Sequence, residues 1–408
     1  RVLKFGGSSL ASADRFLAVA NIIKEQSKIA QVAVVVSAPQ GVTNHLVAMA
    51  ENISDDVKLQ ADLGHFKQAI ETIIDDLSAT SSDFNRQHCQ QVLAHCENQL
   101  SRYMQGATML SFCPEHIRAR IISMGERLSV AILSSALASK GETVTELEPE
   151  KFLRTSDDWL NAVADLVLCK ETFQDVYSEL ERISIMPGFI GINCDGQITT
   201  LGRNGSDYSA AVLAVCTQAE CCEIWTDVDG IYNADPRVIK DATLLDYLSY
   251  QEAMELSYFG ASVLHPKTIG PIAQYHIPCL IKNTGNPLAP GTLIDNENDQ
   301  QKRVKAISNL DDLTMVNVSG PGMKGMVGMA SRVFATMSRE NVSLVLISQS
   351  SSEYCISFCI YSADAARAEQ SLKDEFELEL LNSLLEPIVL KKELSIVDKF
   401  HRNKLLKY

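Results

Sequence analysis

The chain has 408 residues, of which 46% are hydrophobic and 21% charged, a mixture typical of two or three globular domains and not of disordered, collagen-like or coiled-coil proteins. Lysine and arginine number 36 against 51 aspartates and glutamates, so the net charge of −15 argues against nucleic acid or an anionic membrane as the main partner. No apolar run reaches the roughly 20 residues that span a bilayer. We expect a cytoplasmic protein with reduced cysteines, because the sequence opens on a strand without a leader and its eleven cysteines include no C-x-x-C pair.

The first 300 residues alternate strand-like and helix-like segments, which predicts an α/β fold with a largely parallel sheet. The polar stretch from 54 to 103 is helical in pattern and is expected to form an inserted hairpin covering one end of the sheet. The expected strands are Val2–Phe5, Val32–Ser37, Thr143–Leu147, Ile185–Gly188, Cys221–Trp225 and Ile277–Lys282. The expected helices are Arg15–Gln26, Thr43–Asn52, Ile117–Lys140, Tyr208–Gln218 and Tyr250–Tyr258.

A second, smaller domain is predicted after a turn-rich and charged linker at residues 283–305. Its elements follow the order strand, helix, strand, strand, helix, strand (βαββαβ), which is the ferredoxin-like pattern. We therefore divide the chain into residues 1–295 and 304–392. Residues 393–408 begin like a strand and turn basic, and we interpret them as the incomplete start of a further domain.

The first motif follows the first strand directly. Lys4 ends the strand, and Gly6, Gly7, Ser8 and Ser9 lead into a helix. Two glycines let a ligand approach the backbone, and their amides can line an anion site at the helix N-terminus. The pattern is neither a Walker A loop nor a dinucleotide fingerprint. A tight turn beside a solvated lysine is the alternative.

Two further turns carry charged residues. The segment from Gly202 to Ser209 brings an arginine, a carboxylate and hydroxyls into one loop before a helix. Arginine suits a substrate carboxylate, although Asp207 could serve only as an N-cap. The segment from Thr226 to Tyr232 follows a buried-looking strand, where open α/β sheets bind ligands. Asp-Gly and Asp-Pro there are also ordinary turn residues, and a lone carboxylate at Glu126 could lie on a solvated helix face.

Three other signals are rejected. His88-Cys89 and His95-Cys96 are too far apart along a helix for one tetrahedral ion. The segment Gly320–Gly325 matches G-x-G-x-x-G, but the elements after it are not a dinucleotide domain. Neither a Ser/His/Asp nor a Cys/His set is apparent, and no set of metal ligands is predicted in the chain.

Taken in order, the motifs resemble the aspartate kinases of the amino-acid kinase superfamily. They are Lys4–Ser9, Val36–Pro39 with Val42–Asn44, Ser123–Glu126, Gly202–Ser209, Trp225–Tyr232 and His265–Thr268. The match is nearest to the kinase portion of the bifunctional aspartokinase/homoserine dehydrogenases, which continue into a second ACT domain and a dehydrogenase. The resemblance implies an αβα kinase domain, an ACT regulatory domain and no dehydrogenase activity in these residues.

The reaction implied is transfer of the ATP γ-phosphate to the β-carboxylate of L-aspartate with Mg²⁺, the first step toward threonine, methionine, lysine and isoleucine. Its acceptor is already ionised at neutral pH, so charge neutralisation is needed and a general base is not. By motif, Lys4, Asp207 and Lys267 should be catalytic. Other ATP contacts implied are Gly6, Gly7, Ser8, Ser9, Thr226, Asp227, Tyr232 and Arg237. Substrate contacts implied are Thr43, Glu126, Arg203 and Ser206, with Glu126 on the α-ammonium and Arg203 on the α-carboxylate.

The ACT segment implies an amino-acid effector, threonine in this branch, and a homodimer or tetramer formed by ACT pairing. The effector-binding stretch corresponds to Asn341, Ser343, Leu344, Ile347 and Gln349. Plain ACT packing is the alternative for each of them. Two competing functions stay open: another kinase of the superfamily, acting on glutamate, acetylglutamate or a nucleotide, and a catalytically silent amino-acid sensor.

Overall fold

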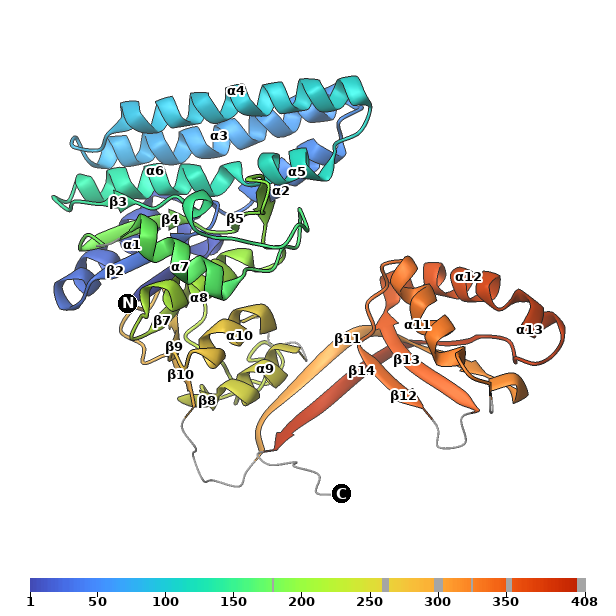
Figure 1. The fold of residues 1–408 in the computed structure, drawn as a ribbon. Coiled ribbons are helices and arrows are strands. Elements are labelled where there is room, and N and C mark those ends of the chain that lie inside the picture. Colours follow the sequence, from blue (N-terminus) through green and yellow to red (C-terminus); the bar gives the residue numbers. More distant parts are fainter. Residues whose placement is uncertain (178–179, 259–263, 297–303, 324–325, 350–353, 402–408) are drawn as a thin grey trace. The chain divides into compact units, whose positions relative to one another are not determined.

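A computed structural model describes residues 1–177, 180–258, 264–296, 304–323, 326–349 and 354–401 (Figure 1). The described chain forms two compact units, one within Arg1–Arg303 and one spanning Val304–His401. The first is a mixed α/β layer structure and the second an antiparallel sheet with helices, as the fold class predicted. Part of the expected linker, residues 297–303, and the tail 402–408 lie outside the described residues.

The first unit is built on one long sheet with the strand order β3-β4-β2-β1-β7-β9-β10-β8. The six strands from β3 to β9 are parallel. β10 then runs antiparallel to β9 and parallel to β8. The strands are β1 (Val2–Phe5), β2 (Val32–Val36), β3 (Thr145–Glu146), β4 (Ile183–Pro187), β7 (Cys222–Thr226), β8 (Tyr247–Ser249), β9 (Cys279–Asn283) and β10 (Thr292–Asp295). The small hairpin β5 (Ile190–Ile192) and β6 (Ile198–Thr200) is separate.

Helices cover this sheet, so the central strands β1 and β2 are buried throughout and are apolar except for Lys4. Leu3 and Phe5 join a core with α1 and α6, whereas Lys4 lies on the opposite side of β1 and pairs with Asp207 of α8. The alternation of the strand therefore sends the lysine toward α8. The helices are α1 (Ala13–Ile29), α2 (Val42–Glu51), α7 (Leu166–Val176), α8 (Gly205–Thr217), α9 (Tyr250–Tyr258) and α10 (Pro266–Gln274).

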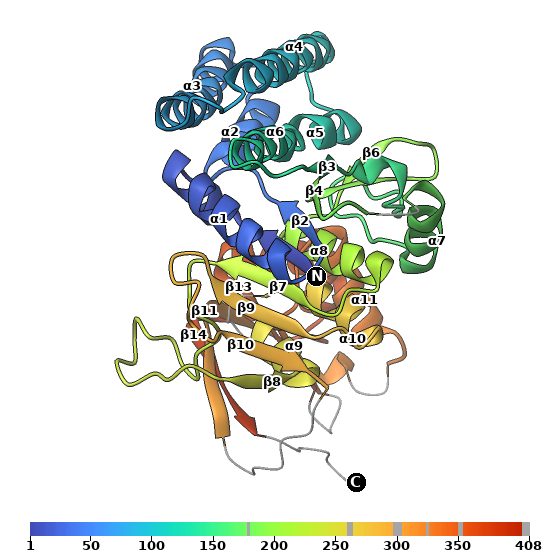
Figure 2. The same ribbon diagram turned by 90° about the vertical axis from the view of Figure 1, so that its left-hand side faces the viewer.

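The predicted hairpin exists as α3 (Asp56–Thr80) and α4 (Arg86–Leu110), longer than the expected 54–103. Contrary to our expectation, the hairpin does not cover an end of the sheet. It lies as an extra layer over α2 and α6 (Figure 2). For this reason α6 is buried on nearly every side, between the sheet below it and α4 above it.

The single helix expected over 117–140 is two helices, α5 (Glu115–Ile122) and α6 (Met124–Ala138). The break falls at Ser123, whose hydroxyl donates to the carbonyl of Arg120. Beyond the break Gly125 lies against Ala38, where a Cβ at Gly125 would come 2.6 Å from the Ala38 Cβ. The break thus puts Glu126 in the first turn of a new helix.

The predicted linker also needs correction, because Thr292–Asp295 is strand β10 of the main sheet. Thr292 and Ile294 are fully buried, and the Thr292 hydroxyl accepts from the Ile231 amide at 2.8 Å. The turn-rich residues before β10 make the return from β9, which explains why this segment looked like a linker.

The second unit has the strand order β12-β13-β11-β14, antiparallel throughout, with helices on one face (Figure 1). The chain order confirms the ferredoxin-like pattern. The elements are β11 (Val304–Ser319), α11 (Met329–Arg339), β12 (Leu346–Gln349), β13 (Cys355–Tyr361), α12 (Ala365–Glu375), α13 (Glu377–Leu381) and β14 (Val389–His401). The second helical segment is interrupted at Phe376, which is fully buried and lies between α12 and α13.

The boundary expected at residue 392 falls inside a strand. β14 pairs with β11 from Asn317↔Val389 to Val304↔His401. The ladder shifts register near Leu313, close to the positive φ values of Asp312 (59°) and Glu393 (58°). Residues 393–401 therefore continue the sheet of this unit, because the long β11 offers them a partner.

Two expectations from composition can be compared with the described structure. One helical stretch, Glu115–Ala138, is long and apolar enough to cross a membrane, but 83% of the apolar 18-residue window within it is buried inside the protein, as in a core helix. All eleven cysteines are free and most are buried, with Cys194 exposed. Burial raises the pKa of the Cys89 thiol to about 11, so this thiol is protonated at neutral pH.

Candidate active site

The carboxyl ends of the parallel strands bring the sequence motifs together at one edge of the first unit. β1 ends at Phe5, β7 at Thr226 and β9 at Asn283, and each is followed by a polar loop. The Ser9 and Thr284 hydroxyls lie 2.7 Å apart, and the Asn283 amide donates to Asp229 at 2.7 Å. The loops after β1, β7 and β9 are thus joined at the edge where open α/β sheets bind ligands.

Lys4 and Asp207 form an ion pair at the centre of this edge. Lys4 Nζ lies 2.5 Å from Asp207 Oδ1, and the two side chains are only 11% and 8% exposed. Asp207 stands in the first turn of α8, where the helix dipole also favours a carboxylate. The aspartate therefore holds the lysine in a fixed place while the charge of the pair remains largely shielded from water.

The loop after Lys4 is shaped for close approach. A Cβ added at Gly6 would lie 3.3 Å from Lys4 Nζ, and one added at Gly7 would lie 2.9 Å from the carbonyl oxygen of Ala38. A side chain at either position would therefore crowd the lysine or the backbone after β2. Ser8 is half-buried in the short 3₁₀ helix Gly7–Leu10, and Ser9 is buried. The two glycines leave room beside the ammonium for an anionic ligand.

Glu126 is a buried carboxylate that forms no ion pair within the part of the chain that the structure describes. It is 3% exposed, and within the described residues its Oε2 has no hydrogen-bond partner. Desolvation raises the pKa of Glu126 to about 7, against the lowering by hydrogen bonds from the backbone of Glu126 itself and of Ala38. Thr43 is half-buried in the first turn of α2, next to Val42, which contacts Gly125. The site therefore holds an acidic group whose charge needs a partner.

The loop before α8 contributes Arg203 and Ser206. Asn204 takes a left-handed conformation (φ 56°) as the residue before the helix, which turns the chain sharply between the two. Arg203 is exposed, whereas Ser206 is buried against Gly188 at the end of β4, where a Cβ would come 2.7 Å from the Ser206 Cβ. An exposed guanidinium and a buried hydroxyl thus lie close to Asp207 in the chain, Arg203 in the loop and Ser206 in the first turn of α8.

Lys267 does not join the Lys4 pair directly. Its Nζ donates to Asn161 Oδ1 at 2.5 Å, and burial lowers the pKa of Lys267. His265, the residue before α10, accepts from the Lys267 amide at 3.2 Å. Burial and then the charges of Lys267 and Arg203 lower the pKa of His265, whereas Asp207 raises it. These electrostatic effects place His265 among the predicted site residues.

Asn161 is a site residue that the sequence did not reveal. It contacts Lys267 and also packs against Gly202, where an added Cβ would come 2.4 Å from Asn161 Oδ1. No motif surrounds Asn161 in the sequence, and its position becomes informative only through contacts with residues 41 and 106 positions away.

The four residues expected at ATP from the β7 loop are spread along it. The Thr226 hydroxyl donates to Asp227 at 3.1 Å at the strand end, and Tyr232 is half-buried beside a bridge to Leu244. Arg237 is 86% exposed and pairs with Asp235 within its own loop. The structure thus places Thr226 and Asp227 at the edge of the sheet and leaves Arg237 in solvent.

Four of the five effector candidates line two separate hollows of the second unit, and Ile347 lines neither. Asn341, Ser343 and Leu344 line one of about 310 Å³ together with Phe334. Gln349 lines another of about 320 Å³ with Met323, Met326 and Met329. Ile347 is 53% exposed on β12.

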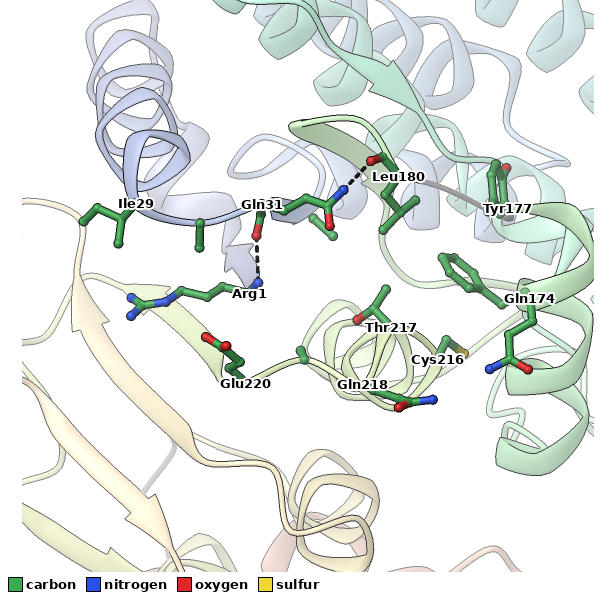
Figure 3. Close-up of a pocket in the computed structure, with 14 residues that line it drawn as sticks. Arg1, Ile29, Gln31, Gln174, Tyr177, Leu180, Cys216, Thr217, Gln218 and Glu220 are labelled. Carbon is green, nitrogen blue, oxygen red and sulfur yellow. Dashed lines mark hydrogen bonds between the residues drawn. The ribbon is translucent and has the colours of Figure 1, made fainter.

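A larger cavity of about 880 Å³ lies at the opposite, amino-terminal edge of the first sheet (Figure 3). Arg1 and Gln31 precede β1 and β2, and Glu220 precedes β7. The α-amino group of Arg1 donates to the Gln31 carbonyl at 2.8 Å, and the Gln31 side chain contacts the carbonyl of Leu180. None of the predicted site residues lines it.

Comparison with known proteins identifies the families that the two units match. Residues 1–283 match the amino acid kinase family and residues 316–376 match the ACT domain. The chain is 46% identical over 400 residues to a bifunctional aspartokinase/homoserine dehydrogenase of Buchnera aphidicola, covering 98% of this chain and 49% of that protein. It thus spans about half the length of the bifunctional relatives it matches.

A relative of more similar length is the lysine-sensitive aspartokinase 3 of Escherichia coli. It is 31% identical over 351 residues, covering 86% of this chain and 76% of that protein. The crystal structure of E. coli aspartokinase III in complex with aspartate and ADP superposes with a TM-score of 0.82 at 28% identity, covering 100% of this chain and 88% of that one. The chain therefore belongs to the amino acid kinase family, in its aspartokinase branch, with an ACT domain after the kinase.

Proposed function

We propose that this chain is an aspartate kinase, which transfers the γ-phosphate of ATP to the β-carboxylate of L-aspartate and forms 4-phospho-L-aspartate. The single observation that carries the proposal is the buried Glu126 carboxylate, which has a free oxygen and a raised pKa. A free amino acid supplies the ammonium this group needs. The crystal structure of the E. coli relative in complex with aspartate and ADP supports the same substrates.

The chemistry follows from charge. The β-carboxylate of aspartate has a pKa near 4, so it attacks as an anion without a general base. The barrier is the approach of two anions, and the ammonium of Lys4 next to Gly6 lowers it by neutralising the transferring phosphoryl group. Asp207 keeps Lys4 in place. Lys267 is the second lysine proposed for the phosphates, and binding would exchange its contact with Asn161 for one with the ligand.

Substrate recognition uses both α-groups of the amino acid. Glu126 binds the α-ammonium, and Arg203 binds the α-carboxylate with its planar guanidinium. Thr43 and Ser206 add hydroxyl contacts from α2 and from the loop before α8. An acetylated amino acid or a nucleotide lacks the free ammonium, so this pocket disfavours both.

ATP fits the carboxyl edge of the sheet, with the amides of Gly6 and Gly7 and the hydroxyls of Ser8 and Ser9 at its phosphates. Thr226, Asp227 and Tyr232 are proposed for the nucleoside, and Arg237 would turn from Asp235 to reach it. Mg²⁺ would enter with the nucleotide, bound by phosphate oxygens and water, because Asp207 is occupied by Lys4. The ion supplies neutralisation of phosphate charge.

Regulation is proposed for the ACT unit. Residues 1–295 form the catalytic domain and residues 304–392 the regulatory one, to which β14 adds its continuation to His401. Threonine is the proposed effector, and its candidate contacts are Gln349 in one hollow of the unit and Asn341 in the other. The chain is proposed to form a homodimer or tetramer through ACT pairing in the cytoplasm. The exposed edge strand β12 supports such pairing, because its four residues are all exposed. The product enters threonine, methionine, lysine and isoleucine synthesis.

The test is formation of aspartyl hydroxamate, dependent on ATP and Mg²⁺, measured with aspartate and with glutamate and repeated with threonine and with lysine. Hydroxamate from aspartate alone is expected, and its absence with any amino acid would leave an amino-acid sensor as the better function. Inhibition by threonine that Gln349→Ala removes is expected for the effector site. Equal activity with glutamate would contradict the substrate assignment.

A further inference from the structure

We propose that His45, Asp62 and His65 bind one divalent transition-metal ion between α2 and α3. This is the one grouping of three such ligands within the described part of the chain. None of the three belongs to the proposed kinase site, so the inference does not depend on the proposed function.

The spacing of the ligand atoms suits a metal. His45 Nδ1 lies 3.2 Å from Asp62 Oδ1, and one ligand atom from each of the three residues lies within 4.8 Å of the others. Two ligands at about 2.0–2.2 Å from a zinc ion, at a near-tetrahedral angle, are themselves about 3.2–3.5 Å apart. The His45–Asp62 pair already has this separation, and a rotation of the exposed His65 side chain completes the set.

The two helices hold the ligands in place. Asp62 and His65 are three residues apart on α3 and therefore lie on the same face. His45 comes from α2, and its ring centre is 5.3 Å from that of His65, with 44° between the ring planes. The residues next to the two histidines, Leu46 and Phe66, are fully buried and fix both helices against the core. The ligands are thus carried by rigid elements.

The donor set indicates the class of metal. Two imidazoles and one carboxylate favour zinc, cobalt, nickel or copper over magnesium and calcium, which prefer oxygen ligands. Three protein ligands leave a coordination position for water. A hydrogen bond between His45 and Asp62 explains that pair alone, but it does not explain why His65 converges on the same point. The side chains of His45 and Asp62 are 34% and 18% exposed, so an ion can enter from solvent.

The sequence pattern gave no sign of this site. Seventeen residues separate His45 from Asp62, and they belong to different helices. The pairs that did look like metal ligands, His88-Cys89 and His95-Cys96, have exposed histidines and buried cysteines on α4. Only the packing of α3 on α2 creates the cluster.

The experiment is a titration of the untagged full chain with Co²⁺ followed by its visible absorption, and with Zn²⁺ followed by calorimetry. Nucleotide is omitted and excess Mg²⁺ is present, so that oxygen-only sites are filled. One equivalent of each metal is expected to bind. His65→Gln and Asp62→Asn should weaken that binding by at least about 100-fold, the upper end of the cost of losing even an outer-shell partner.

His88→Gln is the matched control, because His88 is an exposed histidine on the neighbouring helix α4, and it should leave binding unchanged. Far-ultraviolet circular dichroism checks the fold of each variant. If Asp62→Asn does not fold, the test depends on His65→Gln alone. This variant is expected to fold because the His65 side chain is exposed. Binding that survives in His65→Gln, or that falls equally in His88→Gln, would overturn the site, as would the absence of saturable binding to the parent chain.

Discussion

Polar residues are buried at the carboxyl edge of the kinase sheet, whereas they are exposed on the edge strand β12 of the ACT sheet. Lys4, Asp207 and Glu126 are buried at the first, and two of them are already paired. Ile347 and Gln349 lie on β12, an edge strand whose four residues are all exposed. A buried site of this kind is organised before its ligand arrives, whereas an exposed edge strand offers unpaired backbone groups to a partner. Catalysis and regulation thus place different demands on the same chain.

Activity should be most sensitive to substitution at Lys4. Lys4→Ala removes the ammonium beside Gly6 and should lower kcat at least about 100-fold, as the loss of one transition-state contact does elsewhere, with a much smaller change in the KM for aspartate. Steady-state kinetics measures both constants. Lys28→Ala is the control, since Lys28 pairs with Glu25 on the surface of α1. An unchanged kcat in Lys4→Ala would remove the contrast between the two regions, because the buried pair would then have no catalytic role.

Glu126 should control aspartate binding more than turnover. Glu126→Gln keeps the shape of the side chain and removes its charge, so the KM for aspartate should rise by about tenfold or more, as for the loss of a charged hydrogen bond. In the parent chain the KM should fall as the pH rises through about 7, since the carboxyl ionises there. The variant should lack this pH dependence. A KM with the same pH profile in both proteins would refute the assignment to the ammonium.

Glu126→Gln also tests whether the Glu126 carboxylate is buried, through its effect on the stability of the fold. The folded pKa of Glu126 is raised from 4.5 to about 7, so the stability that its protonated form contributes is fully present below pH 4.5 and is lost as the pH rises through 7. At pH 8, where the buried Glu126 is ionised, the free energy of unfolding of the parent chain is lower by about 3 kcal/mol. Glu126→Gln should therefore melt higher than the parent at pH 8, by roughly 6 °C, and less so at pH 5. Calorimetric melting curves at the two pH values decide, and a constant difference would mean that Glu126 titrates normally.

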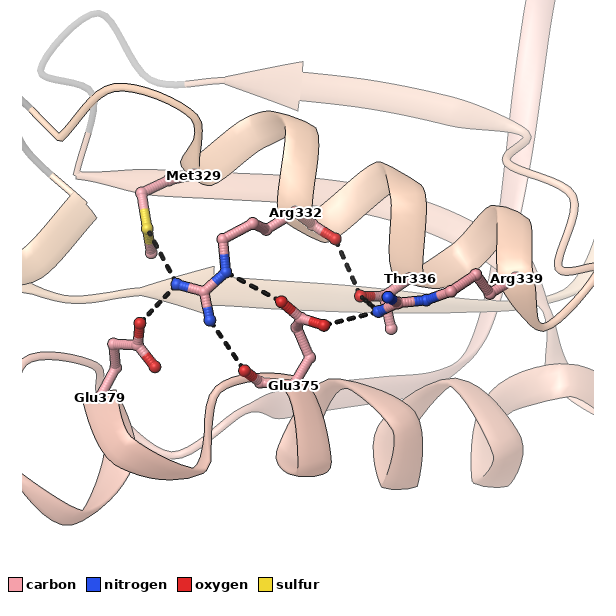
Figure 4. A network of polar contacts seen from close by, with 6 residues as sticks. All are labelled: Met329, Arg332, Thr336, Arg339, Glu375 and Glu379. Carbon is pink, nitrogen blue, oxygen red and sulfur yellow. Dashed lines mark hydrogen bonds and ion pairs between the residues drawn. The ribbon is translucent and has the colours of Figure 1, made fainter.

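Substitutions on the surface of the ACT unit should have the weakest effects. Arg332 of α11 contacts Glu375 at 2.9 Å and also pairs with Glu379 (Figure 4). Its guanidinium carbon lies 4.5 Å from the Phe376 ring centre. Its side chain is 35% exposed, so water screens the pairs and Arg332→Met should cost only about 1 kcal/mol.

Arg367→Met is the matched control, because Arg367 pairs with Asp364 in the same unit, and it should have almost no effect on the melting temperature. Kinase activity without an effector should be unchanged in both variants. Loss of basal activity in Arg332→Met would mean that the ACT network supports the catalytic edge, and the two regions could then no longer be treated separately.

Much of the fold was predictable because it depends on local pattern. The apolar runs of β1 and β2 marked buried parallel strands, and the order βαββαβ marked the second unit. The sequence pattern did not identify elements that depend on packing against other parts of the chain. β10 looked like a linker because turn residues precede it, and the 117–140 helix hid a break at Ser123.

The amino-acid sequence alone was enough to predict the αβα kinase and ACT architecture and the residue types at the catalytic edge, because its motifs resemble those of the aspartate kinases. The hydrophobic pattern added that the motifs at Lys4 and Thr226 lie at the ends of buried strands. Which of those residues meet depends on how the elements pack. Packing pairs Lys4 with Asp207, leaves Glu126 buried without a cation, joins Lys267 to Asn161 and places His45 beside His65. The resemblance had already named Lys4 and Asp207 together as catalytic. The other contacts could not be predicted, because burial and ion pairing join residues from separate elements and the spacing of residues along the chain shows neither.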